Sequence, residues 1–192
     1  MAWKQAQGAG EYFQHYPRVP ALLTAHARGR DNAMACAWHT SISFSPPLFG
    51  VSVSPKRFTF EFIKESGEFG VNFVPYELAE LIASIGGCTG REVDKFARYN
   101  LVKVPALKTS VPILKNAYAA YECKLVEQRT LGDHEWLVGE IVASHWDEAA
   151  FTAEGFIDLD RITPALYIGA ERYLPSPKGP ARHLDRKVYG KR

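Results

Sequence analysis

The chain has 192 residues, of which 46% are hydrophobic and 23% are charged, and this composition is ordinary for a globular protein with one sizeable core. No uncharged apolar run approaches the roughly 18 residues that a membrane-spanning helix needs. Residues 1–18 also lack the apolar segment of a secretory signal, so we expect a cytoplasmic protein.

The net charge of +2 conceals an uneven distribution of charge. Residues 178–192 carry six Lys or Arg and one Asp, whereas the other 177 residues carry 17 basic and 20 acidic side chains. We predict an N-terminal arm at 1–19, one folded domain at 20–175 and a basic tail at 176–192. Such a tail is more often a solvated or docked extension than a nucleic-acid contact, so nucleic acid is not an expected partner.

The cysteines and histidines give no sign of a disulfide framework or a metal site. Cys36, Cys88 and Cys123 are far apart, and no pair has the spacing of zinc ligands. The histidines form no H-x-x-x-H or HExxH pattern. We therefore predict buried thiols that act as small hydrophobic side chains, and no metal ion.

Apolar alternation predicts the strands in the first half of the chain. We expect them at 20–26, 32–40, 48–54 and 68–74, with a turn at 27–31 that makes the first two a hairpin. Pro46 and Pro47 cannot lie inside a central strand, so they precede the third one. In that strand Phe49, Val51 and Val53 alternate with small residues, which leaves room on one face for a ligand or another backbone.

Helical spacing predicts short helices at 59–66, 75–85 and 90–100, the last with Val93, Phe96 and Ala97 facing inward. The second half is mostly strands. A long hairpin is expected from 117–131 and 134–146 around Gly132 and Asp133, and a last strand at 163–174. No βαβ alternation and no internal repeat is visible. The predicted fold is mainly β, a closed antiparallel barrel with short helical insertions.

The end of the third strand is the first candidate for a binding site. Ser52, Ser54, Arg57 and Thr59 gather hydroxyls and a cation just before a predicted helix N-terminus, which suits a phosphate. On these residues alone a plain strand-to-helix turn with Thr59 as N-cap is preferred. No Walker motif is present and no GxGxxG follows a strand, so neither a P-loop nor a dinucleotide-binding site is indicated.

Hydroxyls and histidines supply further candidates. Thr40, Ser41 and their neighbours could bond the polar edge of a ring or, equally well, their own backbone. His39, His134 and His145 lie in or beside strands, where a structural role is the simplest interpretation. His134 follows Gly132 and Asp133 at the mouth of a hairpin, where a titratable ring could meet a substrate.

Several separated motifs, taken in chain order, resemble the flavin reductase-like, FMN-binding split-barrel proteins. They are Asn32-Ala33-Met34-Ala35, Trp38-His39-Thr40-Ser41, Pro46-Pro47, the segment 52–59, Glu68-Phe69-Gly70-Val71-Asn72, the segment 90–96, and Gly132-Asp133-His134 followed by Val138-Gly139-Glu140. The resemblance extends from about residue 20 to residue 174, and the flavoredoxin-like branch resembles the chain most.

The resemblance implies a homodimer of split barrels with one FMN per subunit. It assigns FMN contacts to Asn32, Met34, Ala35, Trp38, His39, Thr40, Ser41, Ser52, Val53, Ser54, Arg57, Thr59, Arg91 and Lys95. Among these, Ser52, Ser54, Arg57 and Thr59 would hold the phosphate, and Arg91 and Lys95 would add positive charge. His134 would lie where a nicotinamide approaches the flavin and is the expected catalytic residue.

The leading hypothesis is thus an FMN-binding oxidoreductase that transfers hydride from NAD(P)H to FMN and electrons onward to an acceptor. The alternative is an FMN-binding electron-transfer protein that a redox partner protein reduces, without NAD(P)H turnover of its own. A third hypothesis is a flavin-free protein that uses the barrel as a binding scaffold.

Overall fold

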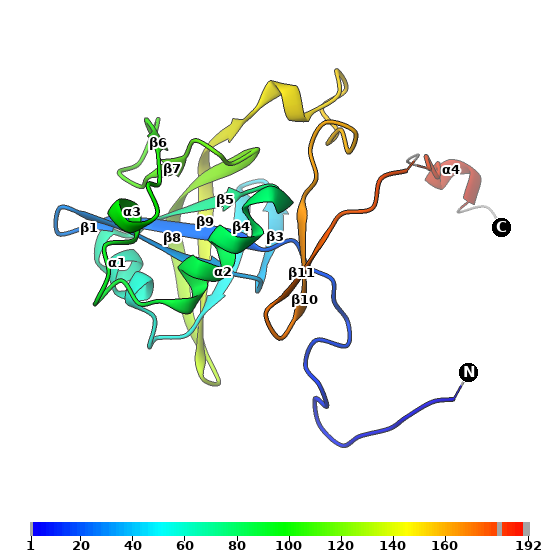
Figure 1. Cartoon of the computed structure of the whole chain (residues 1–192), viewed down its shortest axis with the longest axis horizontal. Coiled ribbons are helices and arrows are strands. Elements are labelled where there is room, and N and C mark those ends of the chain that lie inside the picture. Colours follow the sequence, from blue (N-terminus) through cyan, green and yellow to red (C-terminus); the bar gives the residue numbers. More distant parts are fainter. Residues whose placement is uncertain (1, 180–181, 190–192) are drawn as a thin grey trace.

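The computed structural model describes residues 2–179 and 182–189 of the chain. Its centre is one seven-stranded antiparallel sheet with the order β2-β1-β5-β8-β9-β4-β3 (Figure 1). The strands are β1 (Ala21–Ala27), β2 (Arg30–Cys36), β3 (His39–Phe44), β4 (Pro47–Val53), β5 (Glu68–Phe73), β8 (Ala119–Leu131) and β9 (His134–Trp146). The predicted mainly-β class is therefore confirmed.

The two edge strands of this sheet force it to curl. β2 and β3 follow each other in the chain but lie at opposite edges, joined only by Ala37 and Trp38. Such a connection spans roughly 10 Å at most, so the edges must approach each other. The Ser52 N–H donates to the Trp38 carbonyl at 2.8 Å across this seam between the connection and β4. The expected closed barrel is only partly formed, because no ladder among the described residues pairs β2 with β3.

The inner face of the curled sheet holds the main core, which helix α1 (Phe58–Ser66) completes. Leu23 and Ala25 of β1 pack there against Phe62 and Ile63 of α1. The helix ends at Gly67, whose φ of 69° is the left-handed conformation that glycine adopts readily. This helix and its stop agree with the sequence prediction.

The outer face of β1 and β2 is covered by the 3₁₀ turn η1 (Tyr76–Leu78) and helix α2 (Ala79–Gly87). Leu22 and Ala33 of the sheet pack against Ile82 and Ile85 of α2. Because β1 is buried on both faces, its sequence is a nearly continuous apolar run.

Three predicted elements differ from the observed ones. The strand expected at 32–40 breaks at the connection between β2 and β3, because the chain there crosses from one sheet edge to the other. The strand expected at 163–174 is a hairpin of β10 (Ala165–Gly169) and β11 (Arg172–Pro175), since residues 169–171 all have positive φ and reverse the chain. The helix expected at 90–100 is only α3 (Lys95–Arg98), which begins after the capping side chain of Asp94. Within it Phe96 packs partly buried against the core, as expected, but Lys95 is buried and Ala97 is exposed, contrary to the expectation.

The long β8–β9 hairpin turns at Gly132 and Asp133 as predicted, and register shifts along it accompany the curl. It also fills the part of the small face of β4 that lies at Gly50. A Cβ at Gly50 would lie 2.2 Å from the indole of Trp136, so that space belongs to a side chain of β9.

The remaining elements are short: β6 (Lys103–Val104), β7 (Ile113–Leu114), η2 (Glu148–Ala150) and α4 (Arg186–Tyr189). The N-terminal arm lies beside the β10–β11 hairpin (Figure 1), where Arg18 and Tyr167 exchange backbone hydrogen bonds of 3.0 and 2.7 Å. Helix α4 belongs to the predicted basic tail, of which residues 180–181 and 190–192 lie outside the described residues. In the part of the chain that the structure describes, no helix is long and apolar enough to cross a membrane.

Candidate functional site

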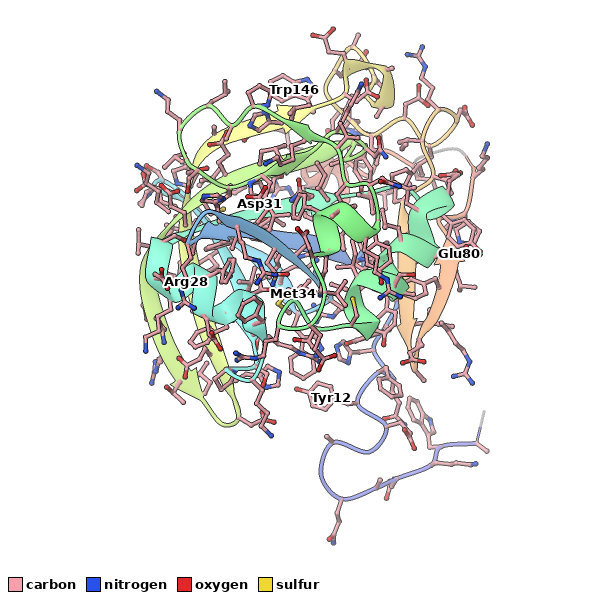
Figure 2. The ribbon with its side chains drawn as sticks, turned by 60° about the vertical axis from the view of Figure 1, so that its left-hand side comes forward. Tyr12, Arg28, Asp31, Met34, Glu80 and Trp146 are labelled. Carbon is pink, nitrogen blue, oxygen red and sulfur yellow. The ribbon has the colours of Figure 1, made fainter. Side chains whose placement is uncertain are left out.

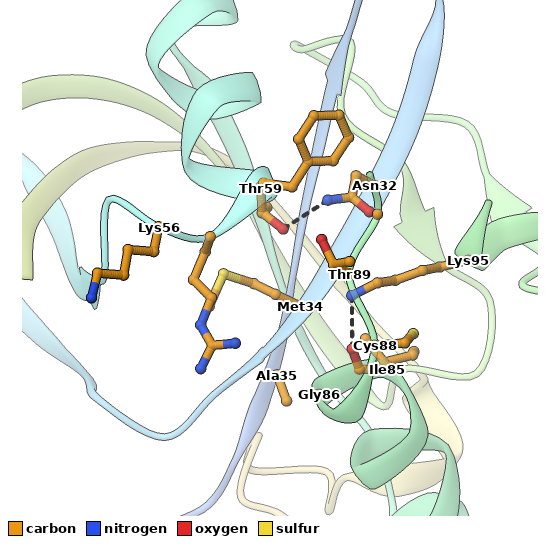
Figure 3. A pocket seen from close by; sticks show the side chains of 13 residues that line it. Asn32, Met34, Ala35, Lys56, Thr59, Ile85, Gly86, Cys88, Thr89 and Lys95 are labelled. Atoms are coloured by element: carbon orange, nitrogen blue, oxygen red, sulfur yellow. Dashed lines mark hydrogen bonds between the residues drawn. The ribbon is translucent and has the colours of Figure 1, made fainter. Parts of the chain in front are cut away.

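A cavity of about 130 Å³ lies between β2, the N-terminus of α1 and the segment that follows α2 (Figure 3). We call it the anion chamber, because its walls carry cations and hydroxyls: Lys56, Arg57, Thr59, Thr89 and Lys95. Apolar side chains of Met34, Ala35 and Ile85 complete the walls. In Figure 3 the ammonium of Lys56 points away from the other labelled side chains, whereas Lys95 reaches inward.

The N-terminus of α1 supplies one wall of this chamber. Arg57 is the N-cap residue, and no side chain accepts from the first N–H groups of the helix. The predicted cap, Thr59, lies two residues further in and is buried. The guanidinium of Arg57 forms no hydrogen bond or ion pair with any described residue. An uncapped helix N-terminus beside a free cation favours an anion.

Thr59 is held in place from the neighbouring strand. The Asn32 side-chain amide donates to the Thr59 hydroxyl at 2.9 Å, and both side chains are buried (Figure 3). Asn32 packs directly against Gly90, where an added Cβ would lie 2.3 Å from the amide oxygen. The segment after α2 therefore packs against Asn32 and restricts the movement of its amide.

Lys95 brings a buried charge to the chamber. Its side chain is only 3% exposed, and its ammonium donates to the backbone carbonyls of Ala33 at 2.8 Å and Ile85 at 2.7 Å. Burial, and to a smaller extent the charge of Arg57, lowers the pKa of Lys95, while Cys88 opposes this shift. No carboxylate of the described residues pairs with this ammonium. A buried cation without a counter-charge is costly, and a bound anion would offset that cost.

Two larger cavities continue from the anion chamber, and Ala35 and Arg57 line all three. One cavity, of about 650 Å³, lies between α2 and the β10–β11 hairpin. The other, of about 310 Å³, lies beneath the N-terminal arm, and we call it the arm chamber. Both have the size of small-molecule sites. In Figure 2 the arm that carries Tyr12 leaves the domain on the side where Met34 lies.

The arm chamber is walled by aromatic rings. The rings of Trp38 and His134 lie 4.8 Å apart, and the Trp38 indole N–H donates to the hydroxyl of Tyr16 at 2.8 Å. The Nδ1–H of His134 donates to the Asp133 carboxylate at 2.7 Å, and this bond lowers the pKa of Asp133. This bond occupies Nδ1 of His134 and leaves Nε2 available to other partners.

Most of the predicted site residues meet in this connected groove. They are Asn32, Met34, Ala35, Trp38, Ser52, Ser54, Arg57, Thr59, Lys95 and His134. Five others lie elsewhere: His39, Thr40, Ser41, Val53 and Arg91 line none of the three cavities.

Each of these five has a different structural setting. His39 is stacked on Phe49 at 5.6 Å and donates to the Val19 carbonyl at 2.8 Å, and burial lowers its pKa. Thr40 and Ser41 are exposed on the edge strand β3. Val53 faces the inner core. Arg91 is paired with Glu61 and lies over the Phe58 ring, outside the anion chamber.

Several lining residues were not predicted as part of the site. Phe13 and Tyr16 come from the arm, Tyr167 from β10, and Cys88 from the segment after α2. The clustering of aromatic residues in the arm was the one signal in the sequence for the first two. Cys36 and Cys123 are buried, as predicted, and burial raises the pKa of both thiols to about 12, whereas Cys88 is only half-buried, contrary to the prediction. Within the described residues, no cluster of His, Cys, Asp and Glu is placed to hold a metal ion.

A cationic chamber that opens into aromatic-walled space is typical of a site for a flat ligand with an anionic end. Residues 13–173 match the family model of the flavin reductase like domain. The chain belongs to this family.

Known relatives agree with this assignment. An FMN-binding protein from Thermus thermophilus is 35% identical, with 94% of this chain and 100% of that chain covered and a TM-score of 0.80. For flavoredoxin from Desulfovibrio vulgaris the identity is 27%, the covered shares are 94% and 97%, and the TM-score is 0.83.

Two curated relatives are also similar. A ferric-chelate reductase (NAD(P)H) of Archaeoglobus fulgidus is 29% identical over 63% of this chain and 71% of that protein. A protein of Aeropyrum pernix is 30% identical over 82% of this chain, which spans 59% of that relative's length.

Proposed function

We propose that the chain binds FMN in the groove and acts as an FMN-dependent oxidoreductase. The observation that carries the proposal is the pair of cations, Lys95 and Arg57, which have no carboxylate partner among the described residues and face the anion chamber. The FMN phosphate carries close to two negative charges near pH 7, so it complements them. The names of the FMN-binding relative and of flavoredoxin support the choice of flavin.

In this proposal the phosphate lies in the anion chamber. Arg57 and the uncapped N-terminus of α1 attract it, and the Thr59 hydroxyl, oriented by Asn32, offers a hydrogen bond. The flavin ring extends along Met34 and Ala35 of the edge strand β2, whose outer side is unpaired within the described residues.

Bound FMN would supply the redox chemistry, accepting hydride equivalents from NAD(P)H and passing electrons on. The chain's own residues orient the bound flavin, exclude water from it and supply polar contacts to it. His134, hydrogen-bonded to Asp133, presents Nε2 beside Trp38 at the open end of the groove, where we propose that nicotinamide approaches. The NAD(P)H in the name of the Archaeoglobus fulgidus reductase supports this donor.

We also propose a homodimer. The edge strand β3 is largely exposed, with Phe44 fully exposed and Ile42 at 44%, and such an apolar edge favours a partner. The size of the protein by light scattering tests this proposal, since a monomer with and without FMN would contradict it.

The first experiment measures the affinity of the protein for FMN and for riboflavin by flavin fluorescence. The protein should prefer FMN, and Arg57→Met should lower that preference by about 10- to 100-fold, the value of one charge-assisted hydrogen bond. Arg91→Met is the matched control, because Arg91 is occupied by Glu61 outside the chamber. Equal affinities for FMN and riboflavin in the wild type would overturn the assignment of the phosphate.

The second experiment records the flavin absorbance under anaerobic conditions with NADH and then NADPH. Bleaching with either nucleotide supports the oxidoreductase, and His134→Ala should slow bleaching while FMN affinity is kept. Bleaching with dithionite alone would instead indicate the electron-transfer protein that a partner reduces.

A further inference from the structure

The N-terminal arm forms one wall of the arm chamber. Phe13 and Tyr16 line this cavity from the arm, together with Trp38, His134 and the end of β4. The arm is anchored, since Arg18 and Tyr167 exchange two backbone hydrogen bonds and the ring of Phe13 covers Gly169. Tyr16 is therefore part of a built wall and not a side chain on a loose terminus.

The hydroxyl of Tyr16 has an unused proton. An indole N–H can only donate, so in the 2.8 Å bond between Trp38 and Tyr16 the phenol oxygen is the acceptor. No described residue accepts the hydroxyl proton of Tyr16. Its ring contacts that of His15 edge-on at 4.9 Å and the tilted ring of Tyr167 at 5.9 Å, and these contacts hold the hydroxyl in position.

The rest of the chamber suits a flat ring. Trp38 and His134 pack on each other, with ring centroids 4.8 Å apart and planes inclined by 44°, and both line the cavity, which measures about 310 Å³, at the small end of ligand sites. A ring in this cavity meets one fixed hydrogen-bond donor at the Tyr16 end. Tyr16 is half-buried, so a ligand that covers its hydroxyl without accepting from it displaces water and leaves the donor unpaired, which selects for a ligand that carries an acceptor.

We propose that Tyr16 is a specificity-determining residue that donates its hydroxyl proton, as a hydrogen bond, to the carbonyl oxygen of a second flat ligand in the arm chamber. The ligand class is a planar conjugated ring bearing a carbonyl: the carboxamide of nicotinamide or an aromatic aldehyde or quinone as acceptor. This proposal depends on the proposed function in one respect only, which is that FMN binds next to this ligand. The donor and the chamber belong to the protein itself.

The test measures binding by calorimetry, first without and then with FMN. The probes are benzaldehyde, styrene, which has the same flat shape without the oxygen, and NAD⁺. Wild-type protein should bind benzaldehyde more tightly than styrene. Tyr16→Phe should lower the affinity for benzaldehyde by about 2- to 10-fold, the value of one neutral hydrogen bond, and leave the affinities for styrene and FMN unchanged.

Tyr12→Phe is the matched control. Tyr12 is also in the arm and its ring lies 5.4 Å from that of Trp38, but it does not line the chamber, so its benzaldehyde affinity should equal that of the wild type. If Tyr16→Phe weakens the binding of NAD⁺ alone, the site belongs to the electron donor. If it weakens the binding of benzaldehyde alone, the site belongs to the electron acceptor, and if it weakens both, the two share the site.

Two outcomes would overturn the proposal: Tyr16→Phe binds both benzaldehyde and NAD⁺ as the wild type does, or its affinity for styrene falls as much as its affinity for benzaldehyde. These results are separable from a failure of the proposed function. If FMN does not bind but the Tyr16-dependent preference for benzaldehyde remains, the FMN assignment fails and the inference about Tyr16 stands.

Discussion

A methyl group at Gly90 should disturb the anion chamber directly. Gly90 is buried, and an added Cβ would lie 2.3 Å from Oδ1 and 2.7 Å from Cγ of Asn32, and 2.8 Å from the Phe58 ring. Real Cβ atoms do not approach other atoms this closely, so Asn32 must move. Asn32 cannot move without breaking its 2.9 Å hydrogen bond to Thr59.

The size of the effect follows from these contacts. Overfilling a packed site costs about 1–3 kcal/mol, and the lost Asn32–Thr59 bond adds about 1 kcal/mol. We expect Gly90→Ala to lower the free energy of unfolding by about 3 kcal/mol, which for a chain of this length is roughly 6–12 °C in Tm. Because Thr59 loses its orienting partner, FMN affinity should also fall about fivefold.

The assay is urea unfolding of the FMN-free protein, followed by FMN titration. Gly87→Ala is the control, because a Cβ at that helical position meets no atom within 4 Å and should add up to about 1 kcal/mol of stability. If Gly90→Ala unfolds at the same urea concentration as the wild type, then Asn32 and Phe58 do not enclose Gly90 as described.

Two further predictions concern the sheet. Burial tends to raise the pKa of Glu122, but hydrogen bonds, led by that of the Leu107 N–H, lower it to about 2. The ionised Glu122 therefore contributes about 3 kcal/mol to the free energy of unfolding above pH 4.5, and this contribution is lost as the pH falls toward 2. Glu122→Gln should remove this loss from the pH dependence of unfolding, whereas Glu127→Gln, exposed on the same strand, should keep it. Gly50→Ala, whose Cβ would meet Trp136 at 2.2 Å, should cost about 1–3 kcal/mol in a thermal melt, and an unchanged Tm would contradict this packing.

The features predicted well from the sequence are those that a short segment specifies by itself. The apolar run of β1, the stop of α1 at Gly67 and the turn at Gly132 all depend on neighbours within a few residues. The motifs that resemble the flavin reductase family located most of the groove for the same reason. Some of them, such as the segment 52–59 and Gly132-Asp133-His134, lie at strand ends and turns, where local spacing is informative.

The features that were missed depend on contacts between distant segments. The resemblance assigns Lys95 to the site, but the predicted helix, with Val93, Phe96 and Ala97 inward, leaves the Lys95 side chain exposed. Its burial depends on the carbonyls of Ala33 and Ile85, which lie 62 and 10 residues away in the chain. Arg91, four residues earlier, was predicted in the same role but meets Glu61 instead. Sequence spacing places both cations near the site and does not decide which one enters it.

The incomplete closure of the barrel and the candidate site are one structural feature. Had β2 paired with β3 along its length, Met34 and Ala35 would face a neighbouring strand, and no groove would run along that edge. Instead Trp38 crosses the gap, held by the Ser52 N–H at its carbonyl and by Tyr16 at its indole. The open edge of β2 thus gives one continuous wall from the cations of the anion chamber to the rings of the arm chamber. A flat ligand with an anionic end needs both environments within one molecule's length, and in this sheet the unpaired edge provides them.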